Sequence, residues 1–150
     1  MHPYSRIFRT ATAAVALATT IGCGFGGPGS PETAVVTGTV TLDGQPVEGA
    51  LLIFTPIAGG RQSGGTTDAE GHYELTFSRD QPGALPGEHR IEISTLVETD
   101  PDSGTASVPE KLPAKYNVAT ELTRTVEADD NVIDFELDSA GKIMTPYVQQ

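Results

Sequence analysis

The stretch from Val35 to Pro56 decides the fold, and it reads V-V-T-G-T-V-T-L-D-G-Q-P-V-E-G-A-L-L-I-F-T-P. Apolar or small residues alternate with threonines over residues 36–42, which is the period of a strand with one buried face. Asp43-Gly44 then interrupts the run, because Gly tolerates positive φ and Asp bonds its own backbone. We expect Gln45-Pro46 to leave the ladder, since Pro has no N–H to donate. Residues 50–55 predict a central strand covered on both faces.

A second reversal follows in the same part of the chain. Asp68-Ala69-Glu70-Gly71 has Asp first and Gly last, the residue preference of a type I turn. Residues 72–77 then leave the turn as a strand, with Tyr73, Leu75 and Phe77 on one side. Together with the two preceding strands, this segment predicts part of an antiparallel sandwich.

The rest of the chain continues the strand pattern. Residues 88–97 alternate strictly and place His89 on the mostly apolar face, where a hydrogen-bonded position at the rim is expected. Further strands are predicted over residues 120–127 and 132–138, and loops over 57–65, 78–86 and 98–117. The expected fold is an all-β, antiparallel β-sandwich of about seven strands spanning residues 34–138. Residues 139–150 are expected to form a frayed C-terminal tail.

The amino end predicts export. Residues 1–21 carry Arg6 and Arg9 before an apolar stretch that is too short for a permanent membrane span, which is typical of a secretory signal peptide. Thr20-Ile21-Gly22-Cys23 resembles a bacterial lipobox, although that pattern prefers Leu where Thr20 stands. The rival cleavage site, Ala16-Leu17-Ala18, would leave a plain secreted chain. We expect lipidation at Cys23, with residues 1–22 as the lipoprotein signal peptide and residues 23–33 as a flexible tether.

Charge and cysteine content limit the partners. The 150-residue chain has 9 Lys and Arg against 20 Asp and Glu. Loss of Arg6 and Arg9 with the signal peptide changes the net charge from −11 to −13. Such a surface is repelled by nucleic acid and by anionic headgroups, so membrane attachment is expected to come from acyl chains on Cys23. The single cysteine excludes an intrachain disulfide.

Several motifs in this order resemble the transthyretin-like β-sandwich, and more closely the carboxypeptidase regulatory-like domain of small bacterial lipoproteins. The motifs are G-T-V at residues 38–40, D-G-Q-P-V-E-G-A at 43–50, T-D-A-E-G-H-Y at 67–73, P-G-E-H-R at 86–90, and the later P-A-K-Y-N and N-V-I-D-F-E-L. The resemblance covers residues 35–137. It implies the sandwich fold and structural turns at Asp43, Gly44, Asp68 and Gly71. It implies little about function, because this domain is mostly an accessory module.

Known enzymes of related fold need residues that this sequence does not offer. Intradiol dioxygenases use a close H-x-H pair on iron, whereas His72 and His89 are far apart in the sequence. Hydroxyisourate hydrolases end in Y-R-G-S, whereas this chain ends in T-P-Y-V-Q-Q. No G-x-S-x-G elbow supports a Ser-His-Asp triad. We therefore expect neither catalysis nor a cofactor.

Metal and ligand sites have weak candidates. Calcium takes carboxylate and carbonyl oxygens, which Asp129, Asp130 and Asn131, or Glu98, Asp100 and Asp102, could supply. Neither set has the spacing of a known calcium loop. Sugar-binding platforms need exposed aromatics, for which Tyr116 and Tyr147 are the candidates, because Tyr73 alternates inward. The expected function is therefore a cell-envelope lipoprotein facing the periplasm or exterior, with a structural or protein-interaction role. Alternatives are a glycan- or peptide-binding module and, third, an enzyme accessory domain.

Overall fold

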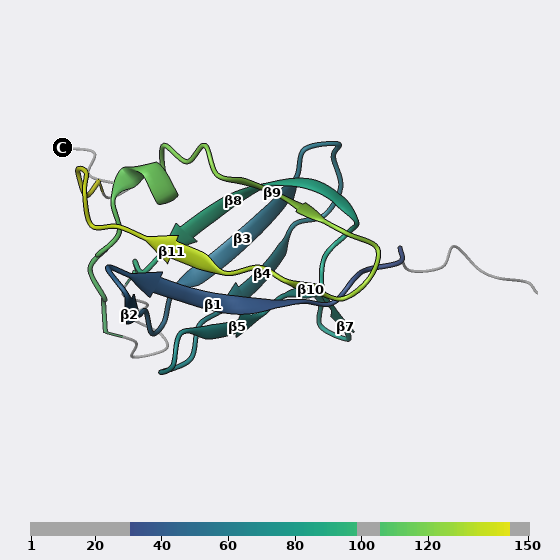
Figure 1. Cartoon of the computed structure of the whole chain (residues 1–150), viewed down its shortest axis with the longest axis horizontal. Helices are drawn as coiled ribbons and strands as arrows, with labels where there is room; N and C mark the ends of the chain where they lie inside the picture. The colour runs from purple at the N-terminus through teal and green to yellow at the C-terminus, as the bar shows by residue number, and fades with distance from the viewer. Residues whose placement is uncertain (1–30, 99–105, 145–150) are drawn as a thin grey trace, which may run out of the picture.

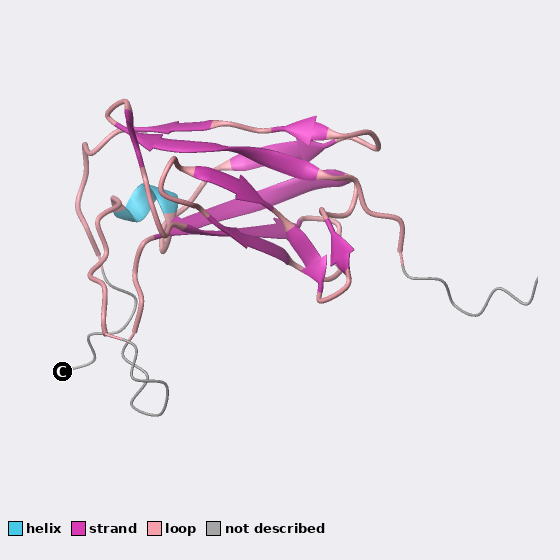
Figure 2. Ribbon diagram, turned by 90° about the horizontal axis from the view of Figure 1, so that it is seen from below, coloured by secondary structure: helices cyan, strands magenta, loops and turns pink. Residues whose placement is uncertain are grey.

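The computed structural model describes residues 31–98 and 106–144 and confirms an all-β sandwich (Figures 1 and 2). One sheet contains β1 (Val36–Leu42), β2 (Gln45–Pro46), β5 (His72–Glu74), β10 (Asn131–Val132) and β11 (Phe135–Leu137). The other contains β3 (Leu51–Pro56), β4 (Ser63–Thr66), β6 (Thr76–Ser78), β7 (Gln81–Pro82), β8 (Gly87–Ser94) and β9 (Thr123–Val126). One 3₁₀ turn, η1 (Ala114–Tyr116), lies at one end of the sandwich.

The pairing is mostly antiparallel, as expected, but the first sheet also has parallel pairs. On one edge, β1 pairs in parallel with β10 and then with β11. On its other edge it pairs antiparallel with β5 and β2. The chain crosses from β9 in the second sheet to β10 through the turn at residues 127–130, so it enters the first sheet in the same direction as β1.

The second sheet runs β7-β6-β4-β3-β8-β9, with antiparallel neighbours throughout. Two segments expected as loops contribute to it: residues 57–65 contain most of β4, and residues 78–86 contain β7. The sequence of β4, S-G-G-T, does not predict a strand, because its two glycines leave no alternation of apolar and polar side chains. Gly65 is required by space, since a Cβ there would lie 2.5 Å from the carbonyl oxygen of Glu74.

The strand expected over residues 72–77 is divided between the sheets. β5 pairs with β1, and β6 pairs with β4 after the chain passes Leu75. Tyr73, Leu75 and Phe77 all remain buried, as the alternation predicted. This crossing strand closes one side of the sandwich.

The core lies between the sheets and contains the residues that the alternation assigned to it. Val36, Val40, Leu52, Phe54, Ile91 and Ile93 are fully buried. The expectation that residues 50–55 are covered on both faces is wrong. Leu51 is 44% exposed and Ile53 is partly exposed, because within residues 31–98 and 106–144 no further sheet covers the outer face of β3.

Both predicted turns are confirmed. Asp43 and Gly44 have φ of 51° and 79° and join β1 to β2 as a two-residue hairpin. Gln45-Pro46 therefore stays in the ladder, contrary to expectation, as an edge segment where Pro needs no N–H partner. In the second turn, the Gly71 N–H donates to the Asp68 carbonyl at 3.0 Å, and Gly71 has φ of 79°.

The ends of the described chain are held against the sandwich. Ala34 and Ala84 exchange backbone hydrogen bonds of 2.9 and 3.0 Å, and Thr33 Oγ1 donates to the Pro82 carbonyl. The last tether residues therefore contact the domain. The C-terminal tail was expected to be frayed, but it is held to the domain as far as Lys142, whose carbonyl accepts the Ala114 N–H at 2.9 Å. In the described ranges no helix is long and apolar enough to cross a membrane.

Candidate functional site

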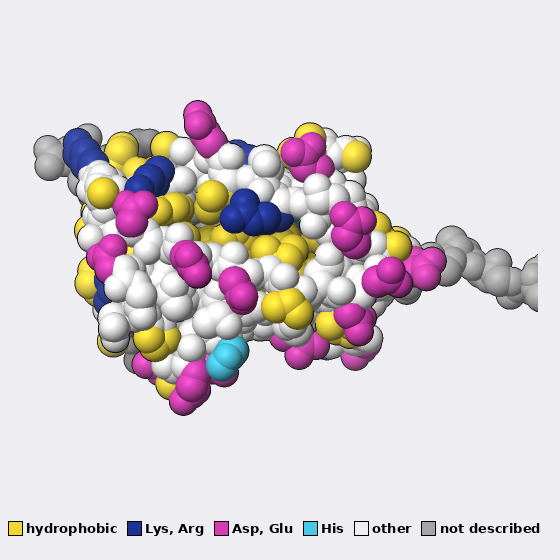
Figure 3. Space-filling view, in the orientation of Figure 1, with side chains coloured by type: hydrophobic (Ala, Val, Ile, Leu, Met, Phe, Trp, Pro, Cys, Tyr) yellow, Lys and Arg dark blue, Asp and Glu magenta, His cyan; other side chains and the backbone are white. Residues whose placement is uncertain are grey.

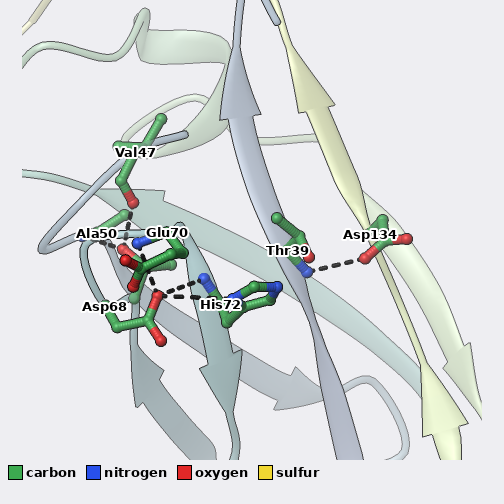
Figure 4. A network of polar contacts seen from close by, with 8 residues as sticks. Thr39, Val47, Ala50, Asp68, Glu70, His72 and Asp134 are labelled. Carbon is green, nitrogen blue, oxygen red and sulfur yellow. Dashed lines mark hydrogen bonds and ion pairs between the residues drawn. The ribbon is translucent and has the colours of Figure 1, made fainter. Parts of the chain in front are cut away.

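The outer face of the first sheet has a polar hollow of about 620 Å³. We define the polar hollow by its lining: Thr37, Gly38, Thr39, Thr66, Asp68, His72, Tyr73, Glu74, Val132 and Asp134. Strand alternation places the side chains of Thr37 and Thr39 on this face of β1, and those of His72 and Glu74 on the same face of β5. Figure 4 shows Asp68 and His72 on one side of β1 and Asp134 on the other.

Asp68 is fixed by the turn that it begins. Its Oδ1 accepts the N–H of Glu70 at 3.0 Å and the N–H of His72 at 2.8 Å. The imidazole Nδ1 of His72 lies 3.8 Å from the same oxygen, and both side chains are largely exposed. This contact is a solvated ion pair at most, so it adds little stability.

Asp134 is fixed by the break between β10 and β11. Its Oδ1 accepts the Thr39 N–H at 2.8 Å, in place of a backbone carbonyl of the neighbouring strand (Figure 4). One residue earlier, the carbonyl of Ile133 accepts a 2.6 Å hydrogen bond from the hydroxyl of Tyr73. Burial raises the pKa of Tyr73, and the charge of Asp134 raises it further, whereas Arg124 opposes them. Tyr73 therefore remains a protonated donor.

The polar hollow is rich in hydrogen-bond acceptors. Three carboxylates line it, and no Lys or Arg is among its lining residues. Because Asp68 and Asp134 each use one oxygen to hold a backbone N–H, their geometry is set by the turn and the strand break. The arrangement can accept hydrogen bonds from a ligand, and its neighbouring acid and base, Asp68 and His72, lie 3.8 Å apart with both side chains largely exposed.

A second hollow, of about 600 Å³, lies at the end of the sandwich where the β1–β2 hairpin turns. One wall is the hairpin segment 42–49, and the other is an arm formed by residues 95–97 and 108–111. We call this the end hollow, and it is lined by Leu42, Gln45, Pro46, Val47, Glu48, Gly49, Thr95, Val97, Val108 and Lys111. The arm is closed by Val97 and Val108, which exchange two backbone hydrogen bonds of 2.9 Å.

The arm is anchored by a buried carboxylate, Glu110. Its Oε1 accepts the Thr95 and Leu112 N–H groups at 3.0 and 2.9 Å, the Thr95 hydroxyl at 2.9 Å and the Lys111 N–H at 3.0 Å. Its Oε2 accepts the Ser94 hydroxyl at 2.5 Å. Burial alone would raise the pKa of Glu110, but these hydrogen bonds outweigh it and hold the pKa below its ordinary value. Glu110 is therefore a buried anion whose role is to fix the arm.

The two histidines of the described chain are separated by the fold. His72 stands on the outer face of the first sheet, and His89 is 1% exposed inside the second. His89 is therefore a core residue rather than a rim residue. Its Nδ1 lies 3.0 Å from the Gly87 carbonyl, while Nε2 has no described partner. Burial lowers its pKa despite the Gly87 contact, so the ring is neutral.

The calcium candidates do not converge. The side-chain oxygen of Asn131 accepts the Glu127 N–H at 2.9 Å, and its amide donates to the carbonyls of Glu127 and Asp129. Asn131 is thus an anchor of this turn, beside the exposed Asp129 and Asp130. Of the other set, Glu98 is exposed, and residues 100 and 102 lie outside the described residues. Within residues 31–98 and 106–144, no three His, Cys, Asp or Glu side chains are placed to hold a metal ion.

Tyr116 is not a platform for sugar. It is 7% exposed, packs into the core, and its hydroxyl contacts Asp138 Oδ2 and the Asp138 N–H at 3.0 Å. Tyr147 and Cys23 lie outside the described residues. The sequence interpretation missed Glu110. The signal that could have found it is a single acid between the two prolines of P-E-K-L-P at residues 109–113.

Comparison with known proteins identifies no family. No family model matches the chain, and no curated protein matches it. A crystal structure of a DUF3823 family protein from Parabacteroides merdae is similar, with 14% sequence identity and a TM-score of 0.38. The similarity covers 71% of this chain and 46% of that protein, so the chain spans less than half of its length.

Proposed function

We propose that this chain is a lipid-anchored cell-envelope protein whose β-sandwich has a structural or protein-interaction role without catalysis. The anchor is a diacylglyceryl group on Cys23, the tether is residues 23–33, and the sandwich is a carboxypeptidase regulatory-like domain. The motifs of residues 38–50 and 67–73 support that relationship, because both confirmed turns, with their positive-φ residues, fall on them.

The observation that carries the proposal is the direction of the sandwich relative to its tether. The described chain enters at Pro31, is fixed beside Ala84, and runs along β1 to the hairpin at the other end (Figure 1). The end hollow is beside that hairpin. A chain anchored ahead of residue 31 would therefore present the end hollow away from the membrane, where a partner can reach it.

A second candidate function is a peptide-binding module, and the end hollow favours it. A concave site of about 300–1,000 Å³ with mostly apolar walls and a few polar groups is usual for small ligands. The glycan alternative is less supported, because the lining of both hollows includes one aromatic side chain, Tyr73, which is buried.

The anchor is tested by expressing the full chain in a bacterium, separating membrane from soluble fractions, and measuring the intact mass of the mature protein. We expect a mature chain that begins at a diacylglyceryl-modified Cys23 and sediments with the membrane. Cys23→Ala should move the protein to the soluble fraction or stall its processing. The matched variant Ser30→Ala should behave as wild type. A mature chain that begins at Thr19 without lipid would overturn the proposal.

A further inference from the structure

The end hollow combines an apolar interior with two opposite charges on opposite walls. Glu48 is on the hairpin wall and Lys111 is on the arm wall, and both are exposed. Among the described residues neither charge takes part in an ion pair, so they also do not pair with each other. A ligand that spans the hollow can therefore meet a carboxylate on one side and an ammonium on the other.

Between these charges the lining is mostly aliphatic. Leu42, Pro46 and Val47 face it from the hairpin, and Val97 and Val108 from the arm. Val108 on the arm is 37% exposed and Val47 on the hairpin is 8% exposed, so the Val108 side chain is the more open of the two to a ligand. Such walls favour an apolar side chain, since burying it removes its surface from water.

Both walls are held in place by buried hydrogen bonds. On the hairpin side, Thr67 Oγ1 donates to the Val47 carbonyl at 2.5 Å and accepts the Ala50 N–H at 2.8 Å. On the arm side, Glu110 accepts the N–H of Lys111 and of Leu112. A site whose walls are already ordered loses less entropy on binding, so the hollow is preorganised for a ligand.

We propose that the end hollow binds a short apolar peptide with free ends, its amino group at Glu48 and its carboxylate at Lys111. The inference names a ligand class for the proposed binding role and rests on that role. A sugar would find no flat aromatic surface in this lining, and a fatty acid would leave Glu48 without a partner. Gln45, at the exposed edge, offers an amide to the peptide group between the two ends.

The test uses the Cys23→Ala chain in solution, which retains every sandwich residue, titrated with the tripeptide Ala-Leu-Ala and followed by NMR. We expect shift changes concentrated on the amides of Val97, Val108 and Val47. The same peptide with acetylated and amidated ends should bind at least threefold more weakly. Equal binding of the capped peptide, or shifts concentrated on the polar hollow, would overturn the proposal.

Charge variants distinguish binding at the two charges of the end hollow from attraction by the net charge of the whole protein. Lys111→Met and Glu48→Gln should each raise the dissociation constant about threefold or more, whereas the matched surface changes Lys142→Met and Glu121→Gln should leave it unchanged. If the two pairs behave alike, the peptide is held by the overall field and the proposal fails.

A blocking variant gives an independent reading. Val108→Trp fills the open side of the hollow from an exposed position and should abolish the shifts, while the matched Val132→Trp, at an exposed position of β10 outside the lining of the end hollow, should retain them. Decanoate serves as the competing probe: tighter binding of decanoate than of the tripeptide at the same residues would replace the peptide assignment. Membrane fractionation and mass, which test the anchor, are unaffected by any of these results, so the two proposals fail separately.

Discussion

The hydroxyl of Tyr73 donates a 2.6 Å hydrogen bond to the carbonyl oxygen of Ile133, and this contact seats the β10–β11 strand against β1. The same carbonyl lies over Gly38, where a Cβ would be only 1.9 Å from the oxygen. The strand break at Ile133 thus needs both a donor at Tyr73 and the absence of a side chain at Gly38.

The first prediction follows from this close approach. Gly38→Ala should lower the free energy of unfolding by about 1–3 kcal/mol or more, because backbone must shift to admit the methyl group. Tyr73→Phe should cost about 1–2 kcal/mol, since the Ile133 carbonyl loses its donor. Urea unfolding measures both. Gly64→Ala is the matched control, because its Cβ meets only the end of Ile53 at 3.3 Å and a carbonyl at 3.4 Å. A loss at Gly38 no larger than at Gly64 would contradict the geometry.

Much of the fold was accessible from the sequence. Alternation identified β1, β8 and β11 and their buried faces, because each has one face on the core and a period-two pattern marks that face. The apolar run of β3 predicted a strand but not that one of its faces is open. The turns at Asp43 and Asp68 were also accessible, because positive φ and side-chain bonding restrict which residues fit. The strand topology was harder to predict from the sequence. The parallel pairing of β1 with β10 and β11 depends on where the chain crosses between the sheets, and the alternation of residues does not encode that crossing.

The candidate sites were harder to predict. β4 was missed because its glycines are selected by close backbone approach rather than by burial of side chains. Glu110 was missed because a buried carboxylate is recognised by its donors, and these come from residues 94–95 as well as from its own neighbours. The end hollow likewise brings together segments near residues 45 and 110, a proximity that only the folded chain defines.

The second prediction concerns the turn that ends at Gly71. A side chain here meets two penalties: φ is +79°, and a Cβ would lie 2.6 Å from the Val40 carbonyl. Gly44 has the same φ, but a Cβ there would meet no atom within 4 Å, so a substitution at Gly44 meets only the penalty of positive φ. Gly71→Ala should therefore lower the midpoint of thermal unfolding more than Gly44→Ala, and Gly71→Val should lower it further. Equal losses at the two glycines would show that Gly71 does not approach β1.

Substitution of Asp68, at the start of the same turn, should lower the stability less than substitution of Gly71. Asp68→Ala removes the acceptor of two backbone N–H groups and should cost about 1–2 kcal/mol, since each exposed donor can turn to water. Asp68→Asn retains an acceptor and should recover part of the loss. Urea unfolding of the two variants distinguishes hydrogen bonding from charge, and identical losses would contradict the assigned role.

The third prediction is a stability profile with two acid transitions. The pKa of His89 is lowered in the folded protein by burial, so below about pH 6.5 the unfolded state binds the extra proton and stability falls with pH. The pKa of Glu110 is also lowered, here by hydrogen bonds that outweigh burial. Its contribution is therefore present above about pH 4.5 and is lost as the pH falls further.

Urea midpoints at pH 7.5, 5.5 and 4 resolve the two groups. His89→Leu should remove most of the difference between pH 7.5 and 5.5, whereas His72→Gln, which changes an exposed imidazole, should retain it. Glu110→Gln should lower stability at pH 7.5 and flatten the fall below pH 4.5. A wild-type slope between pH 7.5 and 5.5 in His89→Leu would show that another group titrates there.

The last prediction concerns the open side of the sandwich, where β9 and β11 end their sheets. Among the described strands β9 has one neighbour, β8, and its register pairs Arg124 with the inward-facing His89. Arg124 therefore points towards the seam between the sheets, and its guanidinium lies 5.2 Å from the centroid of Phe135. Figure 3 shows basic atoms lying across a band of hydrophobic surface at this place. An inward-pointing charge on an edge strand is a known guard against edge-to-edge pairing.

We expect Arg124→Leu to keep the fold but promote self-association, because it leaves an apolar seam between two unpaired strand edges without a charge that must be desolvated. Sedimentation velocity over a concentration series measures the effect, as larger species in Arg124→Leu than in wild type. Arg124→Lys keeps the charge and should sediment as the wild type does. Arg90→Leu makes the same change on β8, which has neighbours on both sides and whose Arg90 pairs with Glu92 at 2.9 Å on the outer face. If Arg90→Leu associates as strongly as Arg124→Leu, added surface hydrophobicity explains the result and Arg124 has no special role at the edge.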